Sequence, residues 1–152
     1  MEVYQNKGYI MECEMPLVNS NPAEMKEIFE SVKTIAIVGL SPNESKDSNM
    51  VAKYLQNAGY KIVPVYPKEE MILGEKVYRS LAEIPFKIDM VDIFRKPAAF
   101  DAVADACITR GDVKVFWGQL GLVNNAAAQK AKDAGMKVVQ NYCTKLEHKA
   151  LM

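Results

Sequence analysis

The chain has 152 residues, about half of them hydrophobic and a quarter charged, which is ordinary for one soluble globular domain. Its 19 basic residues balance its 19 acidic ones, which argues against general attraction to nucleic acids or anionic membranes. No hydrophobic run approaches the ~20 residues of a membrane span, and no basic region precedes an apolar core at the N-terminus. Three widely spaced cysteines without a CxxC pair fit a reducing compartment, so we expect a cytoplasmic protein.

The first residues differ from the rest of the chain because residues 1–16 show no hydrophobic periodicity. We therefore predict an N-terminal arm over residues 1–20 that docks on the body or on another subunit. A single domain is expected over residues 21–152. Its first helix is predicted over residues 23–32, with Asn21 placed to cap it.

Residues 34–58 contain the strand, turn and helix start on which the predicted ligand site depends. Residues 34–38 form a short hydrophobic run that ends at Gly39, which is typical of a strand buried on both faces. A polar loop follows, and residues 48–58 then repeat hydrophobic side chains at helical spacing, with Asp47 or Ser48 as the expected cap. Strand, glycine turn, loop and helix start together favour an anion-binding site, because free N–H groups and the helix dipole face the loop.

Strands and helices alternate through the remainder of the chain. Further strands are predicted over residues 61–67, 88–94, 113–117 and 136–139, and further helices over residues 81–84, 97–110, 124–134 and 141–152. Pro64 weakens the second strand unless that strand lies near a sheet edge. The pattern predicts an α/β, Rossmann-like, doubly wound fold with a five-stranded parallel sheet and helices on both faces. We expect strand order 3-2-1-4-5, numbered along the chain, with a ligand crevice where the order reverses.

Several nucleotides can be tested against the strand ends. A dinucleotide fingerprint needs three glycines in the first loop and an acidic residue at the second strand tip, and neither is present. A P-loop motif is also absent. Coenzyme A fits better because its pyrophosphate and 3′-phosphate need donors from more than one loop. Three loops offer such donors: Ser41, Ser45 and Lys46; Tyr66 and Lys68; Arg95 and Lys96.

At these motifs the chain resembles a known family, the small stand-alone coenzyme A-binding proteins related to the nucleotide-binding domain of the succinyl-CoA synthetase α-subunit. The matching segments are AIVGLSPNESKDSNMVAKYL, GYKIVPVYP with LGEKVYRSL, DMVDIFRKP, and VFWGQLGLVNNAAAQKAKDAGMKVVQNYC. The resemblance implies a Rossmann-like fold with coenzyme A bound across three strand tips. It implies contacts from Gly39, Leu40, Ser41 and Lys46, from Val65, Tyr66, Pro67 and Lys68, and from Phe94, Arg95, Lys96 and Pro97.

The sequence departs from this family at two of those positions. Family members commonly carry Arg where Lys46 stands, and lysine keeps the charge but lacks the bidentate fork of arginine. They commonly carry Asn where Tyr66 stands, and a tyrosine there could instead stack on adenine. Gln119, after the fourth strand, is a further candidate for contact with the pantetheine end.

The preferred hypothesis is a protein that binds coenzyme A or an acyl-CoA and is not an enzyme by itself. Synthetases with this fold need a phosphorylated histidine and a nucleotide-grasp partner, and the single histidine, His148, is poorly placed for that role. Cys143 and His148 lie out of phase on a helix, which argues against a nucleophile and base pair. An alternative for Cys143 is exchange with the cofactor thiol.

Two other functions remain open on the sequence. The first is an NADP-linked oxidoreductase of the same fold, in which Lys68 attracts a ribose phosphate and Tyr54, Tyr66 or His148 supplies a proton. The second is a regulatory or assembly module, in which the arm and the hydrophobic helix faces bind a partner or a second copy of the chain. We expect no metal site, because no ordinary ligand spacing is present.

Overall fold

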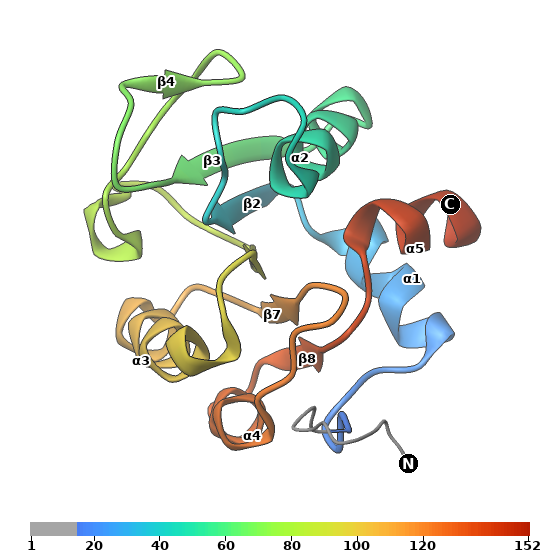
Figure 1. Ribbon diagram of the computed structural model, residues 1–152. Coiled ribbons are helices and arrows are strands. Elements are labelled where there is room, and N and C mark those ends of the chain that lie inside the picture. Colours follow the sequence, from blue (N-terminus) through green and yellow to red (C-terminus); the bar gives the residue numbers. More distant parts are fainter. Residues whose placement is uncertain (1–14) are drawn as a thin grey trace, which may run out of the picture.

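The computed structural model describes residues 15–152 and places five parallel strands in one central sheet (Figure 1). The predicted α/β Rossmann-like fold is confirmed. The sheet strands are β2 (Thr34–Val38), β3 (Lys61–Val65), β6 (Met90–Ile93), β7 (Val115–Gly118) and β8 (Lys137–Val139). The other elements are α1 (Pro22–Ser31), α2 (Asp47–Asn57), the hairpin β4 (Met71–Ile72) and β5 (Glu75–Lys76), η1 (Leu81–Glu83), η2 (Pro97–Ala99), α3 (Phe100–Arg110), α4 (Asn125–Asp133) and α5 (Thr144–Leu151).

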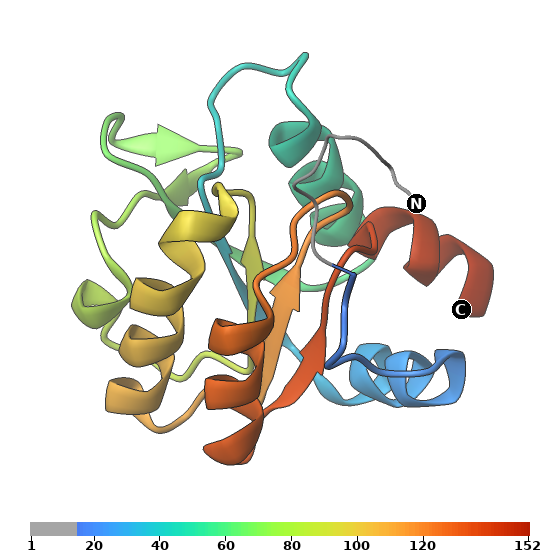
Figure 2. The ribbon, with the colours of Figure 1, turned by 60° about the horizontal axis from the view of Figure 1, so that its bottom comes forward.

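Helices cover both faces of this sheet, so every strand is buried (Figures 1 and 2). Helices α1, α2 and α5 lie on one face, and α3 and α4 lie on the other. Side chains alternate between the two cores along β2: Ile35 and Ile37 pack with α1 and α2, whereas Ala36 and Val38 pack with α3. None of the helices in the described part of the chain is long and apolar enough to cross a membrane.

The predicted order of the strands was wrong. The observed order is β3-β2-β6-β7-β8, so the third strand along the chain lies beside the first instead of outside the second. Pro64 of β3 explains the difference. Its carbonyl accepts from the Tyr78 N–H (3.0 Å) on the outer edge of β3, and a residue's N–H and C=O point to the same side of a strand. Proline therefore lacks a donor on the side where another full strand would need one.

The first helix forms as predicted. Asn21 Oδ1 accepts from the Glu24 N–H (2.8 Å), and Glu24 Oε1 accepts from the Asn21 N–H (2.8 Å), which makes a reciprocal capping box. Met25, Ile28 and Phe29 form its buried face. The cap predicted for α2 was wrong, because Lys46 occupies the N-cap position and its side chain makes no capping bond.

Part of the predicted arm lies in the described chain. Residues 1–14 lie outside it, whereas Asn19 and Ser20 bond to the β8 region, with Ser20 Oγ donating to the Val138 carbonyl (2.7 Å). The Leu17 N–H donates to Asn125 Oδ1 (2.8 Å) at the start of α4. The end of the arm is thus tied to the outer edge of the sheet. Its role, and the boundary at residue 20, stay predictions.

Candidate functional site

The observed strand order brings the tips of β2 and β6 directly together. Gly39, after β2, has φ +89°, and a Cβ built on it would lie 2.7 Å from the Phe94 carbonyl oxygen. The Gly39 N–H donates to the Val65 carbonyl (2.9 Å), and the Phe94 N–H donates to the Val38 carbonyl (2.8 Å). Only glycine fits this conformation at this distance, so three strand tips converge on residue 39.

Two cavities open beside this convergence, and Phe94 and Arg95 line both of them. The Gly39 cavity has a volume of about 450 Å³ and is lined by Val38, Gly39, Val65, Tyr66, Pro67, Arg79, Phe94 and Arg95. The Gln119 cavity has a volume of about 570 Å³ and is lined by Asp47, Met50, Val51, Phe94, Arg95, Lys96, Gln119, Leu120, Leu122, Cys143, Lys145 and Leu146. Because they share two residues, the cavities meet at the tip of β6.

Seven of the thirteen predicted site residues line these cavities, namely Gly39, Val65, Tyr66, Pro67, Phe94, Arg95 and Lys96. The structure does not bring the other six to them, namely Leu40, Ser41, Ser45, Lys46, Lys68 and Pro97. Leu40 is fully buried in the hydrophobic core. Contact between the thirteen residues and coenzyme A stays a prediction.

The loop between β2 and α2 is largely bonded to itself. Ser41 Oγ accepts from the Asn43 N–H (3.1 Å), and Asn43 Oδ1 accepts from the Ser45 N–H (2.9 Å). Buried Ser48 accepts from the Ser41 N–H (3.0 Å) through its hydroxyl, and buried Asn49 donates to the Ser41 carbonyl (2.9 Å). Ser41 and Ser45 therefore support the loop. Ser48, expected as a cap, fastens the loop to the helix.

Arg79 is a site residue that the sequence analysis missed. Its Nη1 donates to the carbonyls of Tyr66 (3.2 Å), Lys68 (2.9 Å) and Glu69 (2.8 Å), and the residue lines the Gly39 cavity. Its Nε and Nη2 groups donate to no atom of residues 15–152. Arg79 thus holds the loop after β3 and keeps donors for a further partner. Arg79 reaches this place because the β4–β5 hairpin returns the chain to the edge of β3, which no local sequence pattern indicates.

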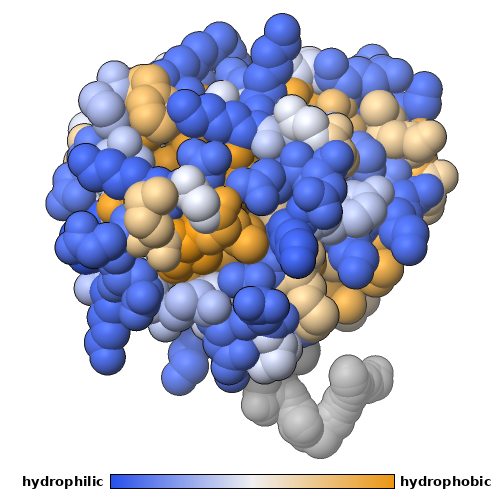
Figure 3. Space-filling view, turned by 90° about the horizontal axis from the view of Figure 1, so that it is seen from above, coloured by the Kyte–Doolittle hydropathy of each residue, from blue (hydrophilic) through white to orange (hydrophobic). Residues whose placement is uncertain are grey.

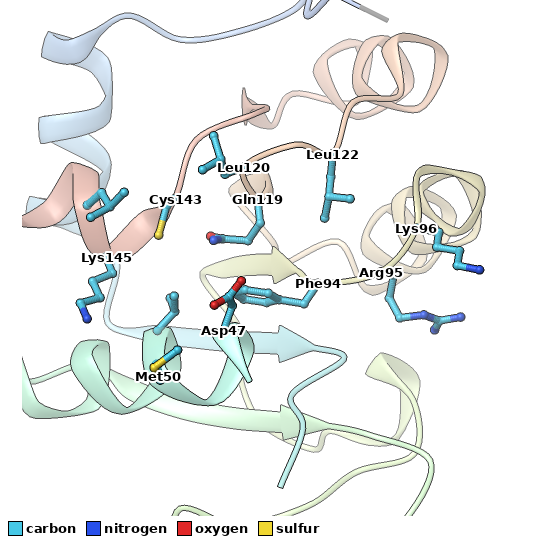
Figure 4. A pocket seen from close by; sticks show the side chains of 12 residues that line it. Asp47, Met50, Phe94, Arg95, Lys96, Gln119, Leu120, Leu122, Cys143 and Lys145 are labelled. Carbon is cyan, nitrogen blue, oxygen red and sulfur yellow. The ribbon is translucent and has the colours of Figure 1, made fainter. Parts of the chain in front are cut away.

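The Gln119 cavity has a mainly hydrophobic lining with a few polar groups. Met50, Leu120 and Leu146 line it and are 43%, 62% and 53% exposed. The face in Figure 3 is mostly hydrophilic, with hydrophobic residues confined to patches between hydrophilic ones. In Figure 4 the Gln119 amide and the Cys143 sulfur point into one part of the cavity, whereas the Arg95 and Lys96 side chains point away from it.

A buried polar chain lies beneath the Gln119 cavity. Thr144 Oγ1 lies 2.8 Å from Asp92 Oδ2 and 2.9 Å from Gln119 Oε1, and the Thr144 N–H donates to Gln119 Oε1 (3.1 Å). The last bond fixes the Gln119 atom as oxygen, so the single Thr144 hydroxyl proton must also be donated to it. Thr144 Oγ1 then accepts, and Asp92 Oδ2 must donate. The neutral carboxylic acid is therefore the form of Asp92 that completes the chain.

The surroundings of Asp92 favour the same protonation state. Asp92 is fully buried in the centre of β6, and its Oδ1 has no hydrogen-bond partner among the described residues. This burial raises the pKa of the Asp92 carboxyl to about 8, because desolvation disfavours the charged form. The hydrogen-bond pattern and the desolvation of Asp92 thus both favour a neutral Asp92 carboxyl at neutral pH.

The other candidates for proton transfer lie apart from both cavities. The Tyr54 hydroxyl is 2.8 Å from His148 Nδ1, and His148 packs edge-on against Phe29, Tyr54 and Tyr60. Burial lowers the pKa of His148. Neither Tyr54 nor His148 lines the cavities, and no cluster of three potential metal ligands occurs in residues 15–152. Of the three predicted proton donors, only Tyr66 lines one of them.

Comparison with known proteins matches residues 33–149 to the family described as CoA binding domain. The chain belongs to the CoA binding domain family. YneT, an uncharacterized protein of Bacillus subtilis, is 43% identical over 130 residues, which span 86% of this chain and 96% of YneT. The solved structure of a hypothetical protein from Pyrococcus horikoshii superposes with a TM-score of 0.84 at 40% identity, covering 93% of this chain and 99% of that one.

Larger proteins that are similar to part of this chain include ligases. Acetate–CoA ligase [ADP-forming] I of Archaeoglobus fulgidus is 38% identical over 61 residues, which make up 40% of this chain and 9% of the ligase. The dinucleotide forming acetyl-coenzyme A synthetase 1 of Ca. Korarchaeum cryptofilum superposes with a TM-score of 0.61 at 26% identity, covering 70% of this chain and 25% of the synthetase. The predicted resemblance to coenzyme A-binding proteins is confirmed, with acetate and acetyl-CoA enzymes as the larger relatives.

Substitution of Gly39 tests the close approach between β2 and β6. A positive φ costs any other residue about 1–2 kcal/mol, and this applies equally to Gly74→Ala in the β4–β5 turn, where the added Cβ meets nothing within 4 Å. Gly39→Ala must also displace the Phe94 carbonyl, so we expect it to lose about 1–3 kcal/mol more. Chemical denaturation measures both variants, and equal losses would contradict the steric argument.

Replacement of Asp92 tests its protonation state. In wild type, the unfolded carboxyl releases its proton near pH 4 and the folded one near pH 8, so the free energy of unfolding falls between these values by up to ~1.4 kcal/mol per pH unit. Asp92→Asn keeps a donor toward Thr144 and cannot ionise, so its stability should lack this decline. Urea denaturation of both proteins from about pH 5 to about pH 8 checks this. Parallel curves would show an ionised Asp92.

Proposed function

We propose that this protein binds coenzyme A or an acyl-CoA across both cavities and is not an enzyme by itself. The observation that carries the proposal is the meeting of two unlike cavities at Phe94 and Arg95. One has guanidinium groups and the Gly39 turn, and the other is mainly hydrophobic. Coenzyme A has the same division between a charged nucleotide and a thiol arm. Its size needs both cavities, and membership of the CoA binding domain family supports this ligand.

The phosphates belong on the Gly39 side of the site. The Arg79 and Arg95 side chains line the Gly39 cavity. Guanidinium groups are suitable partners for phosphate because they form charge-assisted, bidentate hydrogen bonds with it. The start of α2 suits a phosphate less well, because the Asp47 carboxylate lies in its first turn and faces the Gln119 cavity (Figure 4).

Isothermal titration calorimetry tests this proposal directly. We expect coenzyme A and acetyl-CoA to bind, and to bind at least about tenfold more tightly than NADP, because the hydrophobic cavity accepts a flexible arm that NADP lacks. Absence of heat with coenzyme A at millimolar concentration would refute the proposal. Tighter binding of NADPH, with a change in nicotinamide fluorescence, would favour the oxidoreductase instead.

Removal of Arg95 tests the place of the phosphates. A charge-assisted hydrogen bond contributes about 1.5–3 kcal/mol, so Arg95→Ala should weaken coenzyme A binding about tenfold or more and flatten its dependence on salt. Arg95→Lys keeps the charge and should lose less. Lys132→Ala, on the exposed end of α4, is the matched control and should bind as wild type does. Equal affinity of Arg95→Ala and the control would place the phosphates elsewhere.

A further inference from the structure

The side-chain amide of Gln119 has partners among the described residues for its oxygen but none for its nitrogen. The residue is only 5% exposed, and its Oε1 is already occupied by the N–H and the hydroxyl of Thr144. Its Nε2 donates to no atom of residues 15–152, and the amide points into the cavity (Figure 4). Among the described residues, Asp92 Oδ1 is the buried side-chain atom without a partner, so Gln119 Nε2 reaches the cavity surface, where it can donate to an acceptor supplied from outside the fold.

The protein holds this donor in one orientation. Rotation of the amide by 180° would point Nε2 at the Thr144 N–H and place two donors face to face. The neutral carboxyl of Asp92 fixes the Thr144 hydroxyl, which in turn fixes Gln119 Oε1. Three residues from β6, the β7–α4 loop and the start of α5 therefore cooperate to aim one N–H group. A chain of buried hydrogen bonds of this kind is rigid.

The surroundings narrow the kind of acceptor. Met50, Leu120 and Leu122 line the same cavity and offer no oxygen or nitrogen from their side chains. The Asp47 carboxylate also lines it, but accepts no hydrogen bond from Gln119 in the structure. The Arg95, Lys96 and Lys145 side chains point away from Gln119 (Figure 4). A neutral acceptor on a partly hydrophobic ligand, such as a carbonyl oxygen, fits this place better than a phosphate.

We propose that Gln119 Nε2 donates a hydrogen bond to a carbonyl oxygen on the thiol arm of the bound cofactor, either a pantetheine amide or the acyl thioester. Thr144 and Asp92 are positioning residues for this contact. The inference rests on the proposed function and extends it, because it assigns the Gln119 cavity to the arm and names the residue that recognises it.

The test compares three ligands by isothermal titration calorimetry. Adenosine 3′,5′-bisphosphate carries the nucleotide without the arm, coenzyme A adds the pantetheine amides, and acetyl-CoA adds the thioester. Gln119→Met, of similar size, should weaken coenzyme A or acetyl-CoA binding about fivefold to tenfold and leave the bisphosphate unchanged. Loss for both arm-bearing ligands identifies a pantetheine amide as the acceptor, and loss for acetyl-CoA alone identifies the thioester. Gln129→Met, on the exposed face of α4, is the matched control.

Variants of Thr144 distinguish a loss of the Gln119 orientation from a general loss of folding. Thr144→Ser keeps the hydroxyl and should retain wild-type affinity for the arm-bearing ligands, whereas Thr144→Val should lose affinity for them and not for the bisphosphate. If Gln119→Met does not fold, Gln119→Glu, which keeps an oxygen toward Thr144 and removes the donor, takes its place. Unchanged affinities for all three ligands, or an equal loss that includes the bisphosphate, would overturn the inference. If wild type binds none of them, the proposed function itself fails.

Discussion

The close approach of two backbones at the tips of β2 and β6 is the constraint on which the site depends. A carbonyl oxygen of Phe94 occupies the space that a Cβ at residue 39 would need, so the chain turns there with a glycine at positive φ. This turn directs the β2–α2 loop away from the sheet and leaves Arg95 beside Gly39. Both cavities meet at this point. A bulkier residue would separate the strand tips and with them the two halves of the site.

Much of the fold could be predicted from the sequence because its signals are local. Hydrophobic runs, a capping asparagine and glycines at helix ends each act within a few residues, and β2 and α1 form where those signals place them. The order of the strands is not local, since it depends on which edge accepts the returning chain. Pro64 carried that information. Its missing donor favours an edge position for the second strand, as observed, whereas the predicted order 3-2-1-4-5 places that strand inside the sheet.

The site could be predicted in part for the same reason. Residues directly after a parallel strand reach the carboxyl edge of the sheet wherever that strand lies, so Tyr66 and Arg95 line the cavities despite the wrong order. Arg79 and Gln119 depend instead on contacts across the fold. Arg79 reaches the Gly39 cavity because the β4–β5 hairpin returns the chain to β3, where the residues around Tyr78 bond to the strand edge. No spacing in the sequence indicates such a return.

The two ends of the site differ in their charges, and the Gln119 cavity has charged side chains of both signs within a mainly hydrophobic lining. Guanidinium groups lie at the Gly39 cavity, where a phosphate would keep them paired. At the far end, the buried chain of Asp92, Thr144 and Gln119 is neutral only because the carboxyl keeps its proton. An ionised Asp92 would claim the Thr144 hydroxyl proton and leave two oxygens, of Thr144 and Gln119, facing each other without one. Desolvation keeps the Asp92 carboxyl neutral and so maintains the orientation of the Gln119 amide at the cavity surface. A buried Asp92 in a central strand weakens the fold at neutral pH, but it holds the geometry of the site.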